Sequence, residues 1–179
     1  MFFTVGLADR NSSILVDQVG LLRQAVRKTR IERPFYIDAW VVLPDHCHAV
    51  WTLPEGDFDF STRWSAIKAR FTRALRARAK SCRRPGFSPA PPVPQIPTEF
   101  PEVRSGQYAG LKPGLRKNKR EQAVWQRRFW EHHVLGPEDY AAAVNYCHIN
   151  PVKHGLVERP EEWPYSSVHR EIRAGRWAA

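Results

Sequence analysis

The sequence has no long apolar run and few cysteines, and both features restrict the class of protein. The sequence contains no stretch of about 18 apolar residues, which is the length that a helix needs to cross a membrane. The opening residues, MFFTVGLADR, reach charged side chains too soon for a secretory signal peptide. The cysteines, Cys47, Cys82 and Cys147, are odd in number and lack Cys-x-x-Cys spacing, which favours reduced thiols. We therefore expect a soluble, cytoplasmic protein with no membrane partner.

Acidic residues are scarce relative to basic ones. The chain of 179 residues has 18 Asp and Glu against 28 Lys and Arg, a formal net charge of +10 and a pI near 10.0. A polyanion is the commonest partner of such an excess, either nucleic acid or a membrane surface. Apolar residues make up 42% of the chain, enough for the core of one domain spanning 1–179.

The local patterns predict a strand first, then a helix, two strands, a helix, a strand and a helix. The two central strands are joined by the short turn Leu-Pro-Asp, so they should pair antiparallel. This order indicates an α+β ferredoxin-like sandwich, a mainly antiparallel sheet with helices on one side. The last helix should end near Ile149, because Asn150 precedes a proline, and a tail with a turn and a short helix should follow from about 160. The expected elements are strands at 2–7, 35–42, 46–53 and 123–135, and helices at about 17–32, 61–80 and 137–149.

A proline-rich segment interrupts the pattern. Residues 85–101 hold seven of the 15 prolines and cannot form a regular element. We interpret the residues at about 84–114 as a basic insertion that is either a loop or disordered.

Two histidines stand two residues apart in a predicted strand, in VVLPDHCHAVW. Alternate residues of a strand share a face, so His46 and His48 project together. Such a pair can chelate a divalent metal or hold a phosphate oxygen. An isolated His-x-His is more often two histidines that form separate hydrogen bonds, so the pair alone decides nothing.

A tyrosine lies off the apolar face of the last predicted helix. Tyr140, Ala143, Val144 and Cys147 should form that face, whereas Tyr146 and Asn150 share a separate flank four residues apart. Tyr146 is then available to solvent or to a site, although a boundary tyrosine with a wet hydroxyl is the commoner case.

Several motifs together resemble one family, the REP-associated tyrosine transposases, relatives of the single-tyrosine transposases of small bacterial insertion sequences. The resemblance covers most of the chain from Phe2 to about Arg170, apart from the proline-rich stretch. It rests on VLPDHCHAVWTLPEG, RWSAIKARFT, WQRRFWEHHVL, VNYCHINPVKHGLV and WPYSSVHR.

The resemblance implies a function and roles for the residues noted above. His46 and His48 would bind Mg²⁺ or Mn²⁺, with Asn150 completing the metal site, and Tyr146 would attack single-stranded DNA to form a covalent 5′-phosphotyrosine. For Asn150, an alternative is a helix-ending cap. The implied substrate is DNA of hairpin-forming palindromic repeats, cleaved and transferred by a monomer or by a homodimer that exchanges the tyrosine helix.

Basic residues near tryptophans suggest where DNA binds. Cations track a phosphate backbone and aromatic rings stack on bases, although Trp64, on an apolar stripe, is better explained as core. The expected DNA-binding residues are Lys68, Arg70, Arg73, Arg127, Arg128 and Lys153, with Trp125 and Trp130 nearby in sequence.

Two departures from the family leave other functions open. Relatives usually carry a basic segment before the first strand, whereas this chain starts inside that strand, and the insertion is longer than expected. A catalytically inactive protein that binds structured DNA or RNA is therefore one alternative. A metallohydrolase in which water attacks and Tyr146 is incidental is another.

Overall fold

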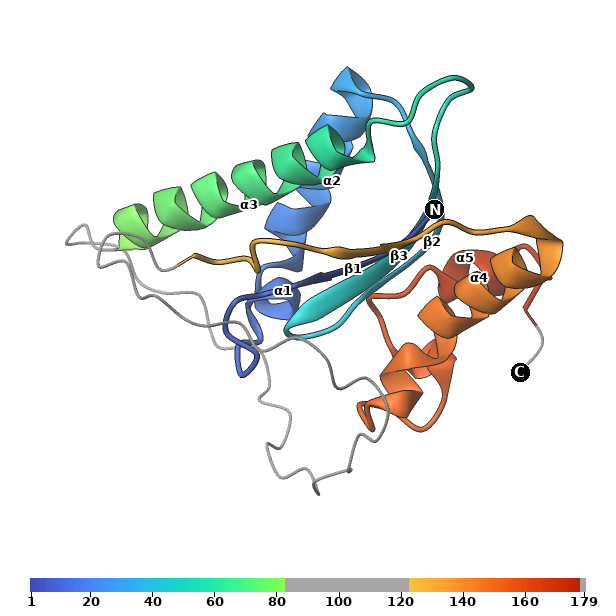
Figure 1. The fold of residues 1–179 in the computed structure, drawn as a ribbon. Coiled ribbons are helices and arrows are strands. Elements are labelled where there is room, and N and C mark those ends of the chain that lie inside the picture. Colours follow the sequence, from blue (N-terminus) through green and yellow to red (C-terminus); the bar gives the residue numbers. More distant parts are fainter. Residues whose placement is uncertain (83–122, 178–179) are drawn as a thin grey trace.

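The chain folds around a four-stranded antiparallel sheet in the order β2-β3-β1-β4 (Figure 1). The computed structural model describes residues 1–82 and 123–177, so the predicted insertion at 84–114 lies outside the described residues. The order of elements along the chain and the central position of β1 and β3 are those of a ferredoxin-like sandwich, which confirms the predicted α+β class. The strands are β1 (Phe2–Gly6), β2 (Tyr36–Val42), β3 (His46–Thr52) and β4 (Trp130–His132).

Helices cover both faces of the sheet, so the prediction of helices on one side is wrong (Figure 1). One face packs on α2 (Val19–Glu32) and α3 (Phe60–Cys82), preceded by the short α1 (Ile14–Asp17). The other face packs on α4 (Gly136–Lys153). The C-terminal stretch forms the 3₁₀ turn η1 (Pro160–Glu162) and α5 (Val168–Arg173), the predicted turn and short helix.

The strands explain why both faces need a cover. Successive side chains of a strand point to opposite faces, and in β1 both sets are apolar: Phe3 packs with the α2 and α3 side chains, and Phe2 with those of α4. In β3, Trp51 lies in the first core and Val50 in the second, and both are buried. A sheet with two apolar faces must bury both, and the helix after β4 covers the second face.

Aromatic rings dominate the core between the sheet and α3. Trp51 stacks on Trp64 with ring centroids 4.3 Å apart, and Phe35 lies 4.2 Å from Trp51. Trp64, Ile67 and Phe71 are all buried, which confirms the apolar stripe predicted for this helix and the core position of Trp64. Each large ring removes roughly 150–250 Å² from water, so this cluster anchors α3 to the sheet.

Helix α4 does not end at Ile149 but continues through Pro151 to Lys153. The turn after the proline keeps its own hydrogen bonds: His154 N–H donates to the Asn150 carbonyl at 3.0 Å. Gly155, with φ +63°, then closes the helix in a Schellman turn, with Leu156 N–H bonded to the Pro151 carbonyl at 2.9 Å. Burial of Pro151 and this closing turn outweigh the local preference against proline, and they extend the helix far enough to place His154.

The stretch before α4 is mostly irregular. Only residues 130–132 of the strand predicted at 123–135 form β4, because Trp125 leaves the ladder and makes an isolated bridge to Leu7. Its ring is buried, 5.4 Å from that of Phe71. None of the helices in the described ranges is long and apolar enough to span a membrane.

Candidate active site on strand β3 and helix α4

His46 and His48 lie on the sheet face that α4 covers. In the ladder with β1, His46 pairs with Gly6 and His48 with Thr4. The two rings are perpendicular with centroids 4.9 Å apart, and each residue is only 4% exposed. The period of the strand therefore brings the two imidazoles side by side, as the sequence predicts.

Each histidine has a partner on its Nδ1 atom. His46 Nδ1 donates to Asp45 Oδ1 at 2.7 Å, and Arg10 Nε holds the other oxygen of that carboxylate at 2.8 Å. His48 Nδ1 lies 2.9 Å from Thr4 Oγ1 on β1. A bond at Nδ1 fixes the ring and leaves Nε2 as the coordinating atom, which is the usual arrangement around metal-bound histidines.

The environment keeps His48 neutral. Burial lowers the pKa of His48 to about 3, and the neighbouring His46 and His154 act in the same direction. His48 Nε2 is buried without a hydrogen-bond partner among the described residues. A buried ring nitrogen with no hydrogen-bond partner is a costly group unless something else binds there.

Asp45 is held as a carboxylate. Burial alone would raise the pKa of Asp45, but the hydrogen bond from His46 and the charge of Arg10 outweigh it and lower that pKa. The carboxylate can therefore only accept, so the proton on His46 resides at Nδ1.

Tyr146 stands beside the histidine pair of its own chain. Its ring meets the His48 ring edge-on with centroids 5.1 Å apart, and it meets Phe2 in the same way at 5.7 Å. The residue is 36% exposed, so it lies outside the core, as the sequence predicts. Ala143 and Cys147 of the predicted apolar face are buried, whereas Tyr140 is 42% exposed.

Asn150 is buried next to this group. It lies one helical turn after Tyr146 and one turn before His154, and these neighbours contact His48 and His46 respectively. Neither Asn150 Oδ1 nor Nδ2 has a hydrogen-bond partner in the described part of the chain. The alternative of a helix-ending cap is wrong, because the helix continues past Asn150 and the side chain caps nothing. Leaving a buried amide without partners costs roughly 1–3 kcal/mol for each group.

His154 is a member of the site that the sequence interpretation missed. Its ring lies 5.1 Å from that of His46, and burial followed by the proximity of His46 lowers its pKa. The signal was present as the spacing of Tyr146, Asn150 and His154 at four-residue intervals. It was hidden because the helix was expected to stop before Pro151. The roles of Thr4 and Arg10 come from tertiary contacts that no spacing reveals.

The donor atoms of this site fit a divalent cation. Two imidazole nitrogens free at Nε2 and one amide oxygen are ligand types that Mn²⁺ accepts well and Mg²⁺ tolerates. Across residues 1–82 and 123–177, no three His, Cys, Asp or Glu side chains converge on a common metal position. The candidate set here is a different one: His46, His48 and Asn150.

The predicted DNA-binding cations separate into three groups. Lys153 lies at the site, with Nζ 4.7 Å from the centroid of the Tyr146 ring. Arg73, Arg127 and Arg128 are exposed.

Lys68 and Arg70 have partners within the chain, on the α3 side of the sheet. Lys68 lies over the Phe129 ring at 5.3 Å, and Arg70 donates to Thr29 Oγ1 at 2.6 Å and pairs with Glu32. The sheet separates them from Tyr146, so the structure does not join all six cations into one groove. Trp125 is core, and Trp130, 57% exposed, stands against Phe2 at 5.7 Å.

Comparison with known proteins gives relatives that match nearly the whole chain. A REP-associated tyrosine transposase of Escherichia coli K12 is 40% identical over 174 residues, which are 97% of this chain and 79% of that protein. A Haemophilus influenzae relative described by the same family name is 37% identical over 97% of this chain and 81% of its own length. No protein-family model matches the chain.

The same family occurs among solved structures. A REP-associated tyrosine transposase bound to a REP hairpin superposes with a TM-score of 0.71 and 39% identity, over 99% of this chain and 84% of that one. Fold and similarity together define a tyrosine transposase. Within this class, the chain belongs to the REP-associated tyrosine transposases.

Proposed function

We propose that this chain cleaves and rejoins single-stranded DNA at hairpin-forming palindromic repeats through a covalent 5′-phosphotyrosine on Tyr146, in the cytoplasm. The observation that carries the proposal is the edge-on contact of Tyr146 with His48, 5.1 Å between ring centroids. The two residues are almost 100 positions apart in sequence, and α4 brings them together on one face of β3. The buried free thiols Cys47 and Cys147 agree with a reducing compartment.

The chemistry needs a nucleophile at the edge of a dry site. Tyr146 Oη attacks the scissile phosphorus and loses its proton; the bond from phosphorus to the 3′ oxygen breaks, and that oxygen leaves as a hydroxyl. One phosphodiester replaces another, so the step is close to energy-neutral and reverses when a second 3′-hydroxyl attacks. Phe2 packs against both Tyr146 and His48 and limits the directions from which water reaches the ring.

His46, His48 and Asn150 are the residues that would hold a divalent cation, Mg²⁺ or Mn²⁺. When bound, the cation supplies Lewis-acid chemistry at a non-bridging phosphate oxygen. Asp45 and Thr4 orient the two imidazoles through their Nδ1 atoms. Two buried groups without partners, His48 Nε2 and the Asn150 amide, support the assignment.

The proposed substrate follows from the relatives and from the charge. The solved relative is described as bound to a REP hairpin, and the net charge of +10 suits a nucleic acid. Lys153, beside Tyr146, would contact the phosphate next to the cleaved bond. Arg73, Arg127 and Arg128 are the exposed cations proposed to bind DNA further away.

The test is the chemistry of the product ends. A labelled single strand that carries a hairpin is incubated with the protein and Mn²⁺, and the fragments are analysed after protease digestion. We expect a 3′-hydroxyl that a polymerase extends and a 5′ end blocked by a residual peptide. EDTA should abolish cleavage, and Asn150→Ala should lower it in proportion to the decrease in metal binding.

Two outcomes would contradict the proposal. A free 5′-phosphate or an equally active Tyr146→Phe variant would indicate attack by water, as in a metallohydrolase. Tight binding of hairpins without cleavage, at any concentration of Mg²⁺ or Mn²⁺, would indicate an inactive DNA-binding protein. An oligonucleotide of the same composition that cannot form a hairpin is the matched control.

A further inference from the structure

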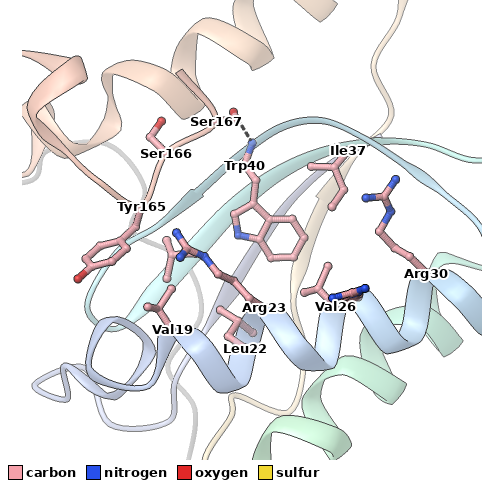
Figure 2. Close-up of a pocket in the computed structure, with 12 residues that line it drawn as sticks. Val19, Leu22, Arg23, Val26, Arg30, Ile37, Trp40, Tyr165, Ser166 and Ser167 are labelled. Carbon is pink, nitrogen blue, oxygen red and sulfur yellow. Dashed lines mark hydrogen bonds between the residues drawn. The ribbon is translucent and has the colours of Figure 1, made fainter. Parts of the chain in front are cut away.

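A groove with a volume of about 300 Å³ lies between α2 and β2, on the sheet face opposite the histidine pair (Figure 2). Its floor is apolar and includes Leu22 and Val26 of α2 and Val42 of β2. None of the described residues that line it is Asp or Glu. An apolar floor without acidic groups suits a ligand that combines a flat apolar part with negative charge.

Arginines of α2 form the rim of the groove. Arg23, Arg27 and Arg30 all line it, and their spacing of four and three residues places them along one side of the helix over about 10 Å. Arg30 donates Nε to the Phe35 carbonyl at 3.0 Å. Arg23 and Arg27 make no hydrogen bond or ion pair with any described residue. Two guanidinium groups are therefore free to bind anions, and phosphates are the anions that arginine matches best.

The opposite wall presents two aromatic side chains on a rigid backbone. Trp40 and Tyr165 line the groove, and both are half-buried (Figure 2). The segment around Tyr165 continues the sheet beyond its edge: Val42 N–H donates to the Tyr165 carbonyl at 2.9 Å, and Ser167 N–H donates to the Trp40 carbonyl at 2.8 Å. A ring fixed beside free guanidinium groups is the combination that binds a base together with its phosphates.

We propose that this groove binds unpaired nucleotides of the DNA substrate, with a base against Trp40 and the adjoining phosphates on Arg23 and Arg27. The inference rests on the proposed function for the identity of the DNA. The volume lies at the lower end of the range for small-molecule sites, so it accommodates a splayed single strand and not a duplex. Val42 at the end of the groove pairs with Cys47, the neighbour of His46. A single strand that leaves the catalytic face at the turn 43–45 therefore reaches the groove around one end of the sheet.

The test compares two oligonucleotides in EDTA, so that no cleavage occurs: a hairpin alone, and the same hairpin with an unpaired flank of ten nucleotides. Wild type should bind the flanked hairpin roughly tenfold more tightly than the bare one. Arg23→Gln/Arg27→Gln should remove this difference without changing affinity for the bare hairpin. The slope of log affinity against log salt should fall by about 0.7 for each phosphate that the variant no longer neutralises.

The matched control removes the same charge from the same region of the chain. Lys28 and Arg33 are exposed and do not line the groove, so Lys28→Gln/Arg33→Gln should keep the preference for the flanked hairpin. Equal decreases in affinity for both double variants, or a flank that adds no affinity in wild type, would overturn the inference.

A cross-link locates the flank directly in the unmodified chain. Flanks carrying 5-iodouracil should cross-link on irradiation to the peptide that contains Trp40 or Tyr165, and cross-links confined to other peptides would overturn the inference. The two proposals fail differently. Flank-dependent affinity without cleavage in Mn²⁺ would refute the proposed function alone, whereas cleavage without flank-dependent affinity would refute the groove alone.

Discussion

The ring of Tyr146 meets the ring of His48 edge-on, with centroids 5.1 Å apart. One residue comes from a helix and the other from a central strand, and no local pattern joins them. Their contact makes the chain's own tyrosine available to its own histidine pair. The tyrosine and the histidines that we propose to act together therefore lie side by side within one chain.

The contact between Thr4 and His48 should control metal binding. Thr4→Val keeps the shape of a strand residue but removes the hydroxyl that holds His48 Nδ1 at 2.9 Å. We expect Mn²⁺ affinity to fall roughly tenfold to 100-fold, and the metal-free protein to lose roughly 1–3 kcal/mol of stability because His48 Nδ1 is left buried without a partner. Free Mn²⁺ measured by electron paramagnetic resonance during titration gives the affinity.

The control for Thr4 is Thr52, a threonine of β3 whose hydroxyl bonds Asp38 at 2.6 Å in an exposed position. Thr52→Val should leave Mn²⁺ affinity unchanged. Equal affinities for Thr4→Val and wild type would show that the hydroxyl does not orient the imidazole.

The turn at Gly155 should govern both stability and the position of His154. Gly155 has φ +63° and its Cβ position is open, so alanine there meets a backbone penalty and no steric clash. Gly155→Ala should lower the free energy of unfolding by about 1 kcal/mol, measured by urea denaturation. Gly20, in α2, has an open Cβ position without a left-handed φ, so Gly20→Ala should instead raise stability by a few tenths of a kcal/mol. If Gly155→Ala left the free energy of unfolding unchanged, Gly155 would not have the left-handed conformation that closes the helix.

Stability should depend on the protonation of His48. Burial lowers its pKa from 6.5 to about 3. Between these two pH values the imidazole is protonated in the unfolded chain but stays neutral in the folded chain. The stability associated with neutral His48 is fully present above pH 6.5. It falls as the pH drops towards 3, by up to about 1.4 kcal/mol per pH unit.

Urea denaturation in EDTA between pH 7 and pH 4 measures this dependence. His48→Gln should show a shallower loss of stability than wild type over that interval. His133 is exposed, and His133→Gln should keep the wild-type slope. Parallel slopes for wild type and His48→Gln would show that the imidazole is not kept neutral in the fold.

Much of the fold was predictable because its signals are local. Alternation in the strand that contains His46 and His48 and the apolar stripe of Trp64, Ile67 and Phe71 depend only on neighbouring residues, and the structure confirms both. The resemblance to the family likewise rested on contiguous motifs. These signals sufficed for the α+β class and for the position of Tyr146 outside the core, whereas the roles of the site residues stay predictions.

The failed predictions depend on tertiary contacts. Asn150-Pro151 favours a helix end locally, yet burial of the proline and the Schellman turn extend α4 to Lys153. Helix α4 packs on the second face of the sheet because the side chains that β1 points to each face are apolar. The number and order of the predicted helices do not show which face each helix covers. Arg70 lies on the polar side of the pattern predicted for its helix, which indicates a free surface cation. In the structure it donates a hydrogen bond to Thr29 and forms an ion pair with Glu32, both on α2, about 40 residues earlier in the chain.

The central claim is that Tyr146 forms the covalent bond to DNA. Incubation with a hairpin-bearing single strand and Mn²⁺, followed by denaturation, proteolysis and mass spectrometry, should yield one nucleotide-bearing peptide with the modification on Tyr146. Tyr140, also exposed on α4, is the control: Tyr140→Phe should keep the adduct and Tyr146→Phe should lose it. An adduct that persists in Tyr146→Phe, or one that maps to another residue, would contradict the account.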